Sequence, residues 1–196
     1  MTKTVTADFV ENNAGDRLLT NGYPAQPNRI LEYLASPCDG SSVTVGSGTY
    51  TFPSVTAQQG GSTSYQMITG SNIYYCPPPE AKRVVYQFTF SLYSVTTHDI
   101  NHYRFYIGDT EIVKARHNRS AQYIENRYQF NWTISIGDSD TPADAKFLSW
   151  TTPKHLYMTF RIYGGSNYSN HHGTRYWDGV GSNQFNIPLL SIIATT

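Results

Sequence analysis

The stretch RVVYQFTFSLY, from Arg83 to Tyr93, decides the fold of this chain, because its apolar and polar residues alternate almost without a break. One side of the alternation carries Val84, Tyr86, Phe88, Phe90 and Leu92. Successive side chains of a strand point to opposite faces, so this pattern predicts a strand with one apolar face. An isolated apolar face is unstable in water, and another layer of the protein must therefore cover it.

The same alternation recurs along most of the chain. RYQFNWTISIG (127–137), HLYMTFRIYGG (155–165) and NHYRFYIGDTEIVKAR (101–116) each predict long strands, the last one interrupted at Gly-Asp and resuming from Glu111 to Arg116. SVTV and TYTF flank Gly-Ser-Gly, which predicts a hairpin, and two more short strands surround Gly-Ser-Asn in YQMITGSNIYYC. About ten strands with almost no helical periodicity indicate an all-β protein.

Strands of about ten residues with one apolar face indicate two sheets packed against each other. The cover for Phe88 and Phe90 is then either the face of Phe130, Trp132 and Ile134 or the face of Phe160 and Ile162. We expect a β-sandwich, with the jelly roll as its leading version.

Two segments depart from this pattern. Residues 1–28 are rich in Asn, Gly and Pro and predict an irregular N-terminal arm, which leaves residues 29–196 as the sandwich domain. The apolar spacing in Arg29–Ser36 predicts one or two helical turns. Pro188, within the last apolar segment, predicts an edge strand or a bulge because proline cannot donate to a ladder.

Composition excludes several classes of protein. The 196 residues include 14 basic and 14 acidic residues, scattered rather than clustered, which argues against a nucleic-acid partner. No apolar run approaches the roughly 18–20 residues that a membrane helix needs, so we expect no membrane insertion. The N-terminal residues show no apolar signal core and no cleavage pattern, so export is not indicated. With 16 tyrosines, the chain is suited to strands and to surfaces that contact other surfaces.

Motifs for chemistry are absent from the sequence. There is no Gly-x-Ser-x-Gly, P-loop or His-Glu-x-x-His motif, and the acidic segment GDSDTPAD (137–144) lacks the spacing of a calcium loop. His98 with His102, and His171 with His172, have poor spacing for a metal. Cys38 and Cys76 are expected to be free rather than bridged. We therefore predict no enzyme activity, no catalytic residues and no cofactor or metal.

Bulky residues on the second face of several strands suggest contact with other copies of the chain. Val85, Tyr93, Tyr157, Tyr163 and Ile193 would all point outward. A cyclic oligomer would cover such a face, whereas the alternative is scattered surface tyrosines, which are ordinary.

The segment from Gly164 to Asn183 is long for a connection, and long connections often carry function. Its aromatic, guanidinium and imidazole groups suit a contact with another subunit or virion protein, packing onto the chain's own sheet, or glycan recognition. The candidate contact residues are Tyr168, His171, His172, Arg175, Tyr176 and Trp177.

Several segments, taken together, resemble a known group of proteins. These are LEYLASPCDGSSVTVGSGTYTFPSVTAQQ, GSNIYYCPPPEAKRVVYQFTFSL, HYRFYIGDTEIVKARH, RYQFNWTISIG, RYWDG and FNIPLLSIIA. Their order resembles that of jelly-roll virion surface proteins from tailed phages and related viruses of marine microbes, over about Ile30 to Thr196. The resemblance lies in strands and turns and transfers no functional residue.

The resemblance implies a trimeric jelly roll similar to the tumour-necrosis-factor fold, made in the host cytoplasm and located on the virion. Such a homotrimer would be a capsid decoration (cement) protein that contacts the major capsid protein. Only about 28 residues precede the domain, which is short for a fibre shaft, so they would serve as an anchoring arm. The candidate anchor residues are Phe9, Val10, Leu18, Leu19 and Tyr23. The alternative is a receptor- or host-glycan-binding tip or adaptor of a tail or head fibre.

Overall fold

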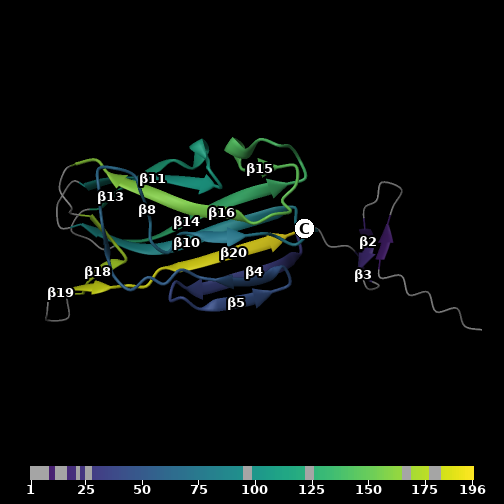
Figure 1. The fold of residues 1–196 in the computed structure, drawn as a ribbon, viewed down its shortest axis with the longest axis horizontal. Coiled ribbons are helices and arrows are strands. Elements are labelled where there is room, and N and C mark those ends of the chain that lie inside the picture. Colours follow the sequence, from purple (N-terminus) through teal and green to yellow (C-terminus); the bar gives the residue numbers. More distant parts are fainter. Residues whose placement is uncertain are drawn as a thin grey trace, which may run out of the picture.

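A computed structural model describes residues 9–11, 17–20, 23–24, 28–94, 99–121, 126–164, 169–176 and 182–196. Strands make up most of this part of the chain (Figure 1), and its helical elements are two short 3-10 turns, η1 (Val113–Ala115) and η2 (Pro142–Asp144). No helix in the described ranges has the length and apolar character to cross a membrane.

The first sheet is built around the strand that opened the sequence analysis. Its main strands are β4 (Ile30–Pro37), β20 (Leu189–Thr195), β10 (Arg83–Ser94) and β14 (Asn126–Ile136). They lie side by side in the antiparallel order β4-β20-β10-β14 (Figure 1). The short strands β15 (Lys146–Phe147), β17 (Ser169–His171) and β7 (Gln59–Gly60) extend this sheet.

The second sheet is centred on two nine-residue strands. β11 (Asp99–Ile107) and β16 (Lys154–Ile162) pair antiparallel. The other edge of β16 pairs with β9 (Ile73–Tyr75) and β8 (Gln66–Met67), and β11 pairs with β13 (His117–Ala121) and β12 (Thr110–Glu111).

The order of these strands is that of a jelly roll. In chain order the eight principal strands are β4, β8 with β9, β10, β11, β13, β14, β16 and β20. The first, eighth, third and sixth form one sheet, and the second, seventh, fourth and fifth form the other. This alternation of the chain between two sheets is the double Greek key of the jelly roll, which confirms the predicted fold class.

Smaller hairpins complete the structure. β5 (Ser42–Val45) and β6 (Gly48–Thr51) form the predicted hairpin, and β18 (Gly173–Tyr176) pairs with β19 (Ser182–Phe185). β1 (Phe9–Glu11), β2 (Arg17–Thr20) and β3 (Tyr23–Pro24) form a separate three-stranded sheet. The prediction that residues 1–28 are irregular was therefore wrong for these strands, whose backbones pair locally.

The core lies between the two sheets. Phe88 and Phe90 are covered by the second sheet, since the ring of Phe90 lies 5.8 Å from that of Tyr103, and Tyr86 lies 4.9 Å from Phe105. Phe130 is instead the cross-strand neighbour of Phe88 within the same sheet. Of the two predicted covers, the face containing Phe160 is therefore the one across the core, and the face containing Phe130 extends the first layer.

Three local predictions were wrong. Arg29–Ser36 is mostly strand, because β4 pairs along the whole length of β20 and buries Leu34. β20 is an interior strand, and Pro188 lies just before it, where no ladder donor is needed. The strand expected from Glu111 to Arg116 ends at Glu111, because the chain turns into η1 and buries Ala115.

Both cysteines are free, as predicted. Cys38 is fully buried, and its thiol donates to the carbonyl oxygen of Gly70 at 3.3 Å. Burial raises the pKa of the Cys38 thiol to about 12, so the group remains protonated and acts as a small core residue.

Candidate functional site

The residues predicted for a contact loop are spread over different environments. Tyr168 and Trp177 lie outside the described residues. Arg175 and Tyr176 belong to β18, for which the structure describes the backbone. The predicted anchor residues Phe9 and Val10 lie in β1, Leu18 and Leu19 in β2, and Tyr23 in β3.

His171 and His172 are not surface residues. Both side chains are 0% exposed, which corrects their assignment to a contact patch. His171 contacts the ring of Phe160 at a centroid distance of 3.8 Å, and its Nε2 lies 3.0 Å from the hydroxyl of Tyr103. The reason for their burial is tertiary: β17 pairs with the end of β10 and so places these side chains over the core.

His172 follows the end of β17 in a left-handed conformation, with φ of 60°. Its Nε2 lies 3.1 Å from the hydroxyl of Thr69, and its backbone N–H donates to the carbonyl of Ser91 at 2.8 Å. Burial lowers the pKa of His172 to about 4 and holds the pKa of His171 well below its usual range. Both rings are therefore neutral at pH 7 and serve as core residues.

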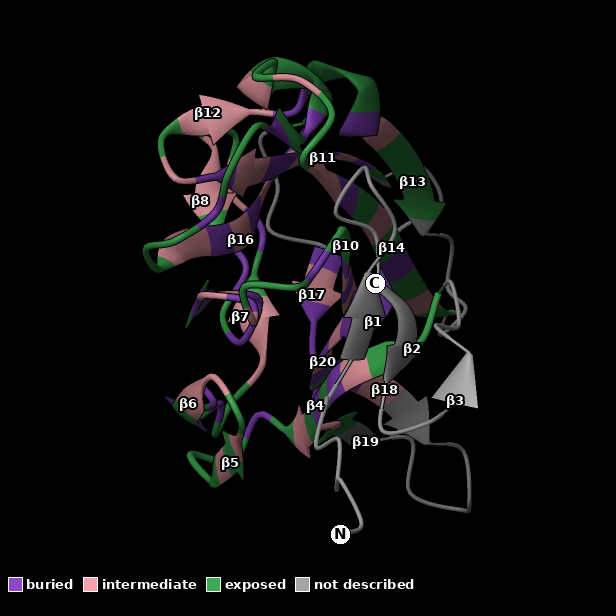
Figure 2. Ribbon diagram, turned by 90° about the vertical axis from the view of Figure 1, so that its right-hand side faces the viewer, coloured by how far each residue is buried: buried purple, intermediate pink, exposed green. Residues whose placement is uncertain are grey.

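The outer face of the second sheet carries a row of stacked rings. Tyr74, His155, Tyr157 and Tyr106 follow one another across β9, β16 and β11, with centroid distances of 4.4, 4.5 and 4.9 Å. Tyr106 and Tyr157 are directly opposite in the ladder, and their rings are parallel within 4°. Buried and half-buried residues alternate along β16 (Figure 2), and His155 and Tyr157 are among the half-buried ones.

Guanidinium groups continue this row along the same two strands. Arg104 lies 3.8 Å above the ring of Tyr65, and Arg161 lies 5.3 Å from the same ring. Arg104 also pairs with Glu111 at 3.5 Å. We call this surface the aromatic face; it comprises Tyr65, Tyr74, Arg104, Tyr106, His155, Tyr157, Arg161 and Tyr163.

The geometry of the aromatic face favours a protein partner. The two central rings, His155 and Tyr157, each have another ring on both sides, so neither offers a free platform on which a sugar ring could stack. Tyrosine and arginine are the residues that most often carry binding energy at protein interfaces. Fixed neighbours also reduce the side-chain entropy that association costs.

The five residues predicted to point outward differ in how far they are buried. Val85 and Ile193 face each other across the ladder and are half-buried, as an outer face requires. Tyr93 is buried instead, because Gly173 at the start of β18 lies against its ring. Tyr163 is 74% exposed and Tyr157 is half-buried, which matches the outward placement predicted for both.

The most buried carboxylate of the described side chains serves a structural role. Glu32 is 5% exposed and accepts hydrogen bonds from the backbone and hydroxyl of Ser47 and from the hydroxyl of Tyr75 at 3.0 Å. Its oxygens are thus occupied by fixed donors. Burial and the neighbouring Glu32 raise the pKa of Tyr75. In the described part of the chain, no three metal-binding side chains gather into a cluster.

Comparisons with known proteins gave no family. No family model matches the chain, and no curated protein matches it. Among solved structures, the Gt strain of infectious bursal disease virus is similar at 9% identity and a TM-score of 0.43, covering 97% of this chain and 38% of that one. The T13 particle of the same virus gives 11% identity and a TM-score of 0.39, covering 97% and 42%.

A third similar structure is the C-terminal CBM6 of LamC from Zobellia galactanivorans, at 10% identity and a TM-score of 0.30, covering 83% of this chain and 99% of that one. The chain spans about two fifths of the length of the two viral chains it matches. The assignment to the jelly roll rests on the strand order itself.

Sequence reasoning found part of the aromatic face and missed the rest. Tyr157 and Tyr163 were predicted to point outward, but Tyr74, Tyr106 and Arg104 were not singled out. The signal was present, because Arg104 and Tyr106 alternate with the apolar Tyr103, Phe105 and Ile107 in β11. What the sequence lacked was the register, which decides that Tyr106 faces Tyr157.

Proposed function

We propose that the chain is a non-enzymatic structural protein of a virus particle: a decoration protein that sits on the capsid surface as a homotrimer. The observation that carries the proposal is the aromatic face, a broad surface of stacked rings and guanidinium groups on an otherwise complete jelly roll. The resemblance to jelly-roll virion proteins adds support. In this proposal the aromatic face contacts other copies of the chain. The N-terminal arm, residues 1–28, contacts the major capsid protein.

The mass of the purified chain in solution tests the oligomer. Light scattering after size exclusion should give three times the chain mass of 22.1 kDa. The double variant Tyr106→Ser/Tyr157→Ser should shift the mass towards the monomer, because it removes the centre of the aromatic face. The matched control Val85→Ser/Ile193→Ser changes an opposed pair on the other sheet and should leave the mass unchanged. A monomeric wild-type chain would contradict the homotrimer.

The anchoring arm has its own test. A chain lacking residues 1–28 should fold, because the jelly roll begins at β4, and should no longer bind virus particles. Binding measured by co-sedimentation with particles lacking this protein would decide the point. Attachment that survives the deletion would exclude the arm as the anchor.

A receptor- or glycan-binding tip of a fibre is the second candidate. Tyr163 favours it, because this ring is 74% exposed and has only His102 beside it, at 6.2 Å, among the ring contacts of the described residues. A free ring face can stack on a sugar. A glycan array should then give a signal that Tyr163→Ala abolishes, whereas a silent array would favour the decoration protein.

A further inference from the structure

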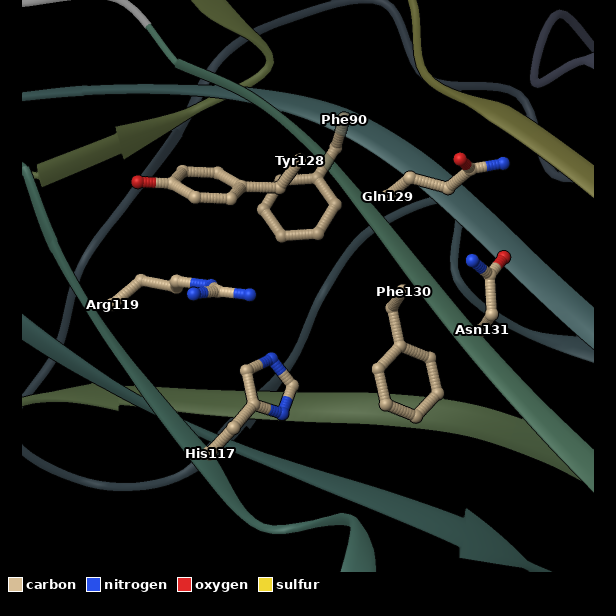
Figure 3. Close-up of a pocket in the computed structure, with 7 residues that line it drawn as sticks. All are labelled: Phe90, His117, Arg119, Tyr128, Gln129, Phe130 and Asn131. Carbon is tan, nitrogen blue, oxygen red and sulfur yellow. The ribbon is translucent and has the colours of Figure 1, made fainter.

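One side of the sandwich stays open between two edge strands. In the described part of the chain, β13 pairs with β11 alone, and β14 pairs with β10 on one edge and with β15 only at Ser135 and Ile136 on the other. Among the described residues, the two sheets thus face each other here without a strand between β13 and β14. A cavity of about 270 Å³ occupies this position (Figure 3).

One wall of this cavity is apolar and rigid. Phe90, Tyr128 and Phe130 line it, and the first two rings lie 6.0 Å apart. His117 is held between Tyr103 and Phe130, nearly parallel to both, at centroid distances of 5.0 and 5.5 Å. Its Nδ1 lies 3.0 Å from the carbonyl oxygen of Ala115, so Nδ1 carries the proton and Nε2 is left as an acceptor.

The other wall carries an arginine without a carboxylate partner in the described residues. Arg119 is exposed and lies 5.4 Å over the ring of Tyr128, and the ion pairs of the described residues involve Arg29, Arg104, Lys114 and Arg116 instead. Gln129 and Asn131 also line the cavity, but they alternate with the buried Phe130 along β14, so their side chains point away from Arg119 (Figure 3). Among the described residues that line the cavity, none is acidic. In Figure 3 the guanidinium of Arg119 reaches between the rings of Tyr128 and His117.

We propose that this cavity binds a small carboxylate about one sugar or aromatic ring in size, with Arg119 holding the carboxylate. A guanidinium group matches a carboxylate through two parallel hydrogen bonds. The volume lies just below the roughly 300 Å³ at which pockets for drug-sized ligands begin, which restricts the ligand to a single ring. The rings of the opposite wall would contact its apolar side.

The two sources of such a ligand are a sugar acid and an aromatic acid, and a titration separates them. The full chain is titrated with D-glucuronate, with benzoate, and with D-glucose as the uncharged match, and binding is followed by calorimetry and NMR shifts. Saturable millimolar binding of one acid, at least tenfold tighter than glucose, supports the site. Tighter glucuronate identifies a sugar acid as the ligand class, and tighter benzoate identifies an aromatic acid.

Matched variants link the binding to the cavity. Arg119→Gln should weaken the bound acid at least tenfold. Arg127→Gln, on the neighbouring strand, should bind as the wild type does, because Arg127 is also exposed but is not among the residues that line the cavity. His117→Phe keeps a flat ring between Tyr103 and Phe130 but removes the acceptor, so it should weaken glucuronate and spare benzoate. Thermal melts of each variant verify folding.

The proposal is overturned if neither acid binds saturably, if glucose binds equally well, or if Arg127→Gln weakens binding as much as Arg119→Gln. These outcomes are independent of the proposed virion role. That role rests on the aromatic face, which is the outer face of the second sheet, and is tested by the mass of the chain in solution and by its binding to virus particles.

Discussion

The two outer faces of the sandwich follow the same alternation of side chains but carry different groups outward. On the second sheet, Tyr106 and Tyr157 stack at the centre of a row that arginines continue. On the first sheet, the equivalent positions hold Val85 opposite Ile193, and Gln87 accepting from the hydroxyl of Ser191 at 3.0 Å. The first sheet also carries an exposed ring, Tyr33, which lies opposite Ile193 and stacks on no other ring of the described residues, whereas the rings of the second sheet stack on one another.

This difference concerns the aromatic residues on the outer face of the second sheet, which lie outside the folding core. Both sheets bury most of their inner-face side chains, with Tyr128 and Trp132 half-buried on the edge strand β14, so the core forms without the rings of either outer face. A solvated outer face is adequately served by short polar and β-branched groups such as those of the first sheet. The stacked rings of the second sheet form the surface that the proposed function assigns to contacts between copies of the chain.

The largest expected effect comes from comparing a substitution on the inner face of the second sheet with one at the next residue, on the outer face. Phe105 is fully buried against Tyr86 and Phe130, so Phe105→Ala should lower the free energy of unfolding by about 3–5 kcal/mol. Tyr106 is the next residue and points outward, so Tyr106→Ala should cost only about 1 kcal/mol. Urea denaturation of the isolated domain measures both. Equal losses would show that the aromatic face is part of the folding core.

An intermediate effect is expected from pH, through the buried histidines. In the unfolded chain His172 titrates near its ordinary pKa of 6.5, whereas in the fold its pKa is about 4. As the pH falls below 6.5, the histidine takes up a proton in the unfolded chain but stays neutral in the folded chain. The free energy of unfolding therefore decreases by about 1.4 kcal/mol per pH unit for each such histidine. This loss for His172 continues down to about pH 4.

His172→Asn tests that assignment, because asparagine tolerates the left-handed conformation and does not titrate. The variant should start from a lower stability because of the lost ring, but its decline between about pH 6.5 and pH 5 should be shallower by one histidine. Urea midpoints across that range measure the slope. An unchanged slope would mean that His172 does not carry the acid sensitivity, which would leave it to the other fully buried histidine, His171.

The smallest effect sharpens the comparison of the two faces directly. A double-mutant cycle on Tyr106 and Tyr157, with alanine at each, should give a coupling energy of about 0.5–1.5 kcal/mol, as stacked aromatic pairs do. The matched cycle on Val85 and Ile193 should give a smaller coupling, because aliphatic pairs across a ladder interact less. Equal couplings would remove the distinction between the faces as far as stability is concerned.

Much of this structure was accessible from the sequence, because side-chain direction in a strand depends only on position along the chain. The period of two in Arg83–Tyr93 and in Arg127–Gly137 predicted the strands β10 and β14 and their inner faces. It also predicted the outward direction of Tyr157. The hairpin of β5 and β6 followed from its glycine turn. These are local properties, and local chemistry decided them.

Pairing partners were beyond the sequence, because they depend on which strands meet. The spacing in Arg29–Ser36 favoured a helix, but this segment pairs with the edge of β20 as a strand, and the pairing buries Leu34. His171 and His172 were predicted as loop residues, but they are buried because β17 pairs with the end of β10. The aromatic face exists only because the register sets Tyr106 against Tyr157, and the open edge between β13 and β14 exists only because no strand of the described chain closes it. The sequence by itself determined which side chains alternate and therefore that two apolar layers form. The tertiary structure decided which side chains meet, because contacts between distant segments are set by strand order and register, and neither is written in the local pattern.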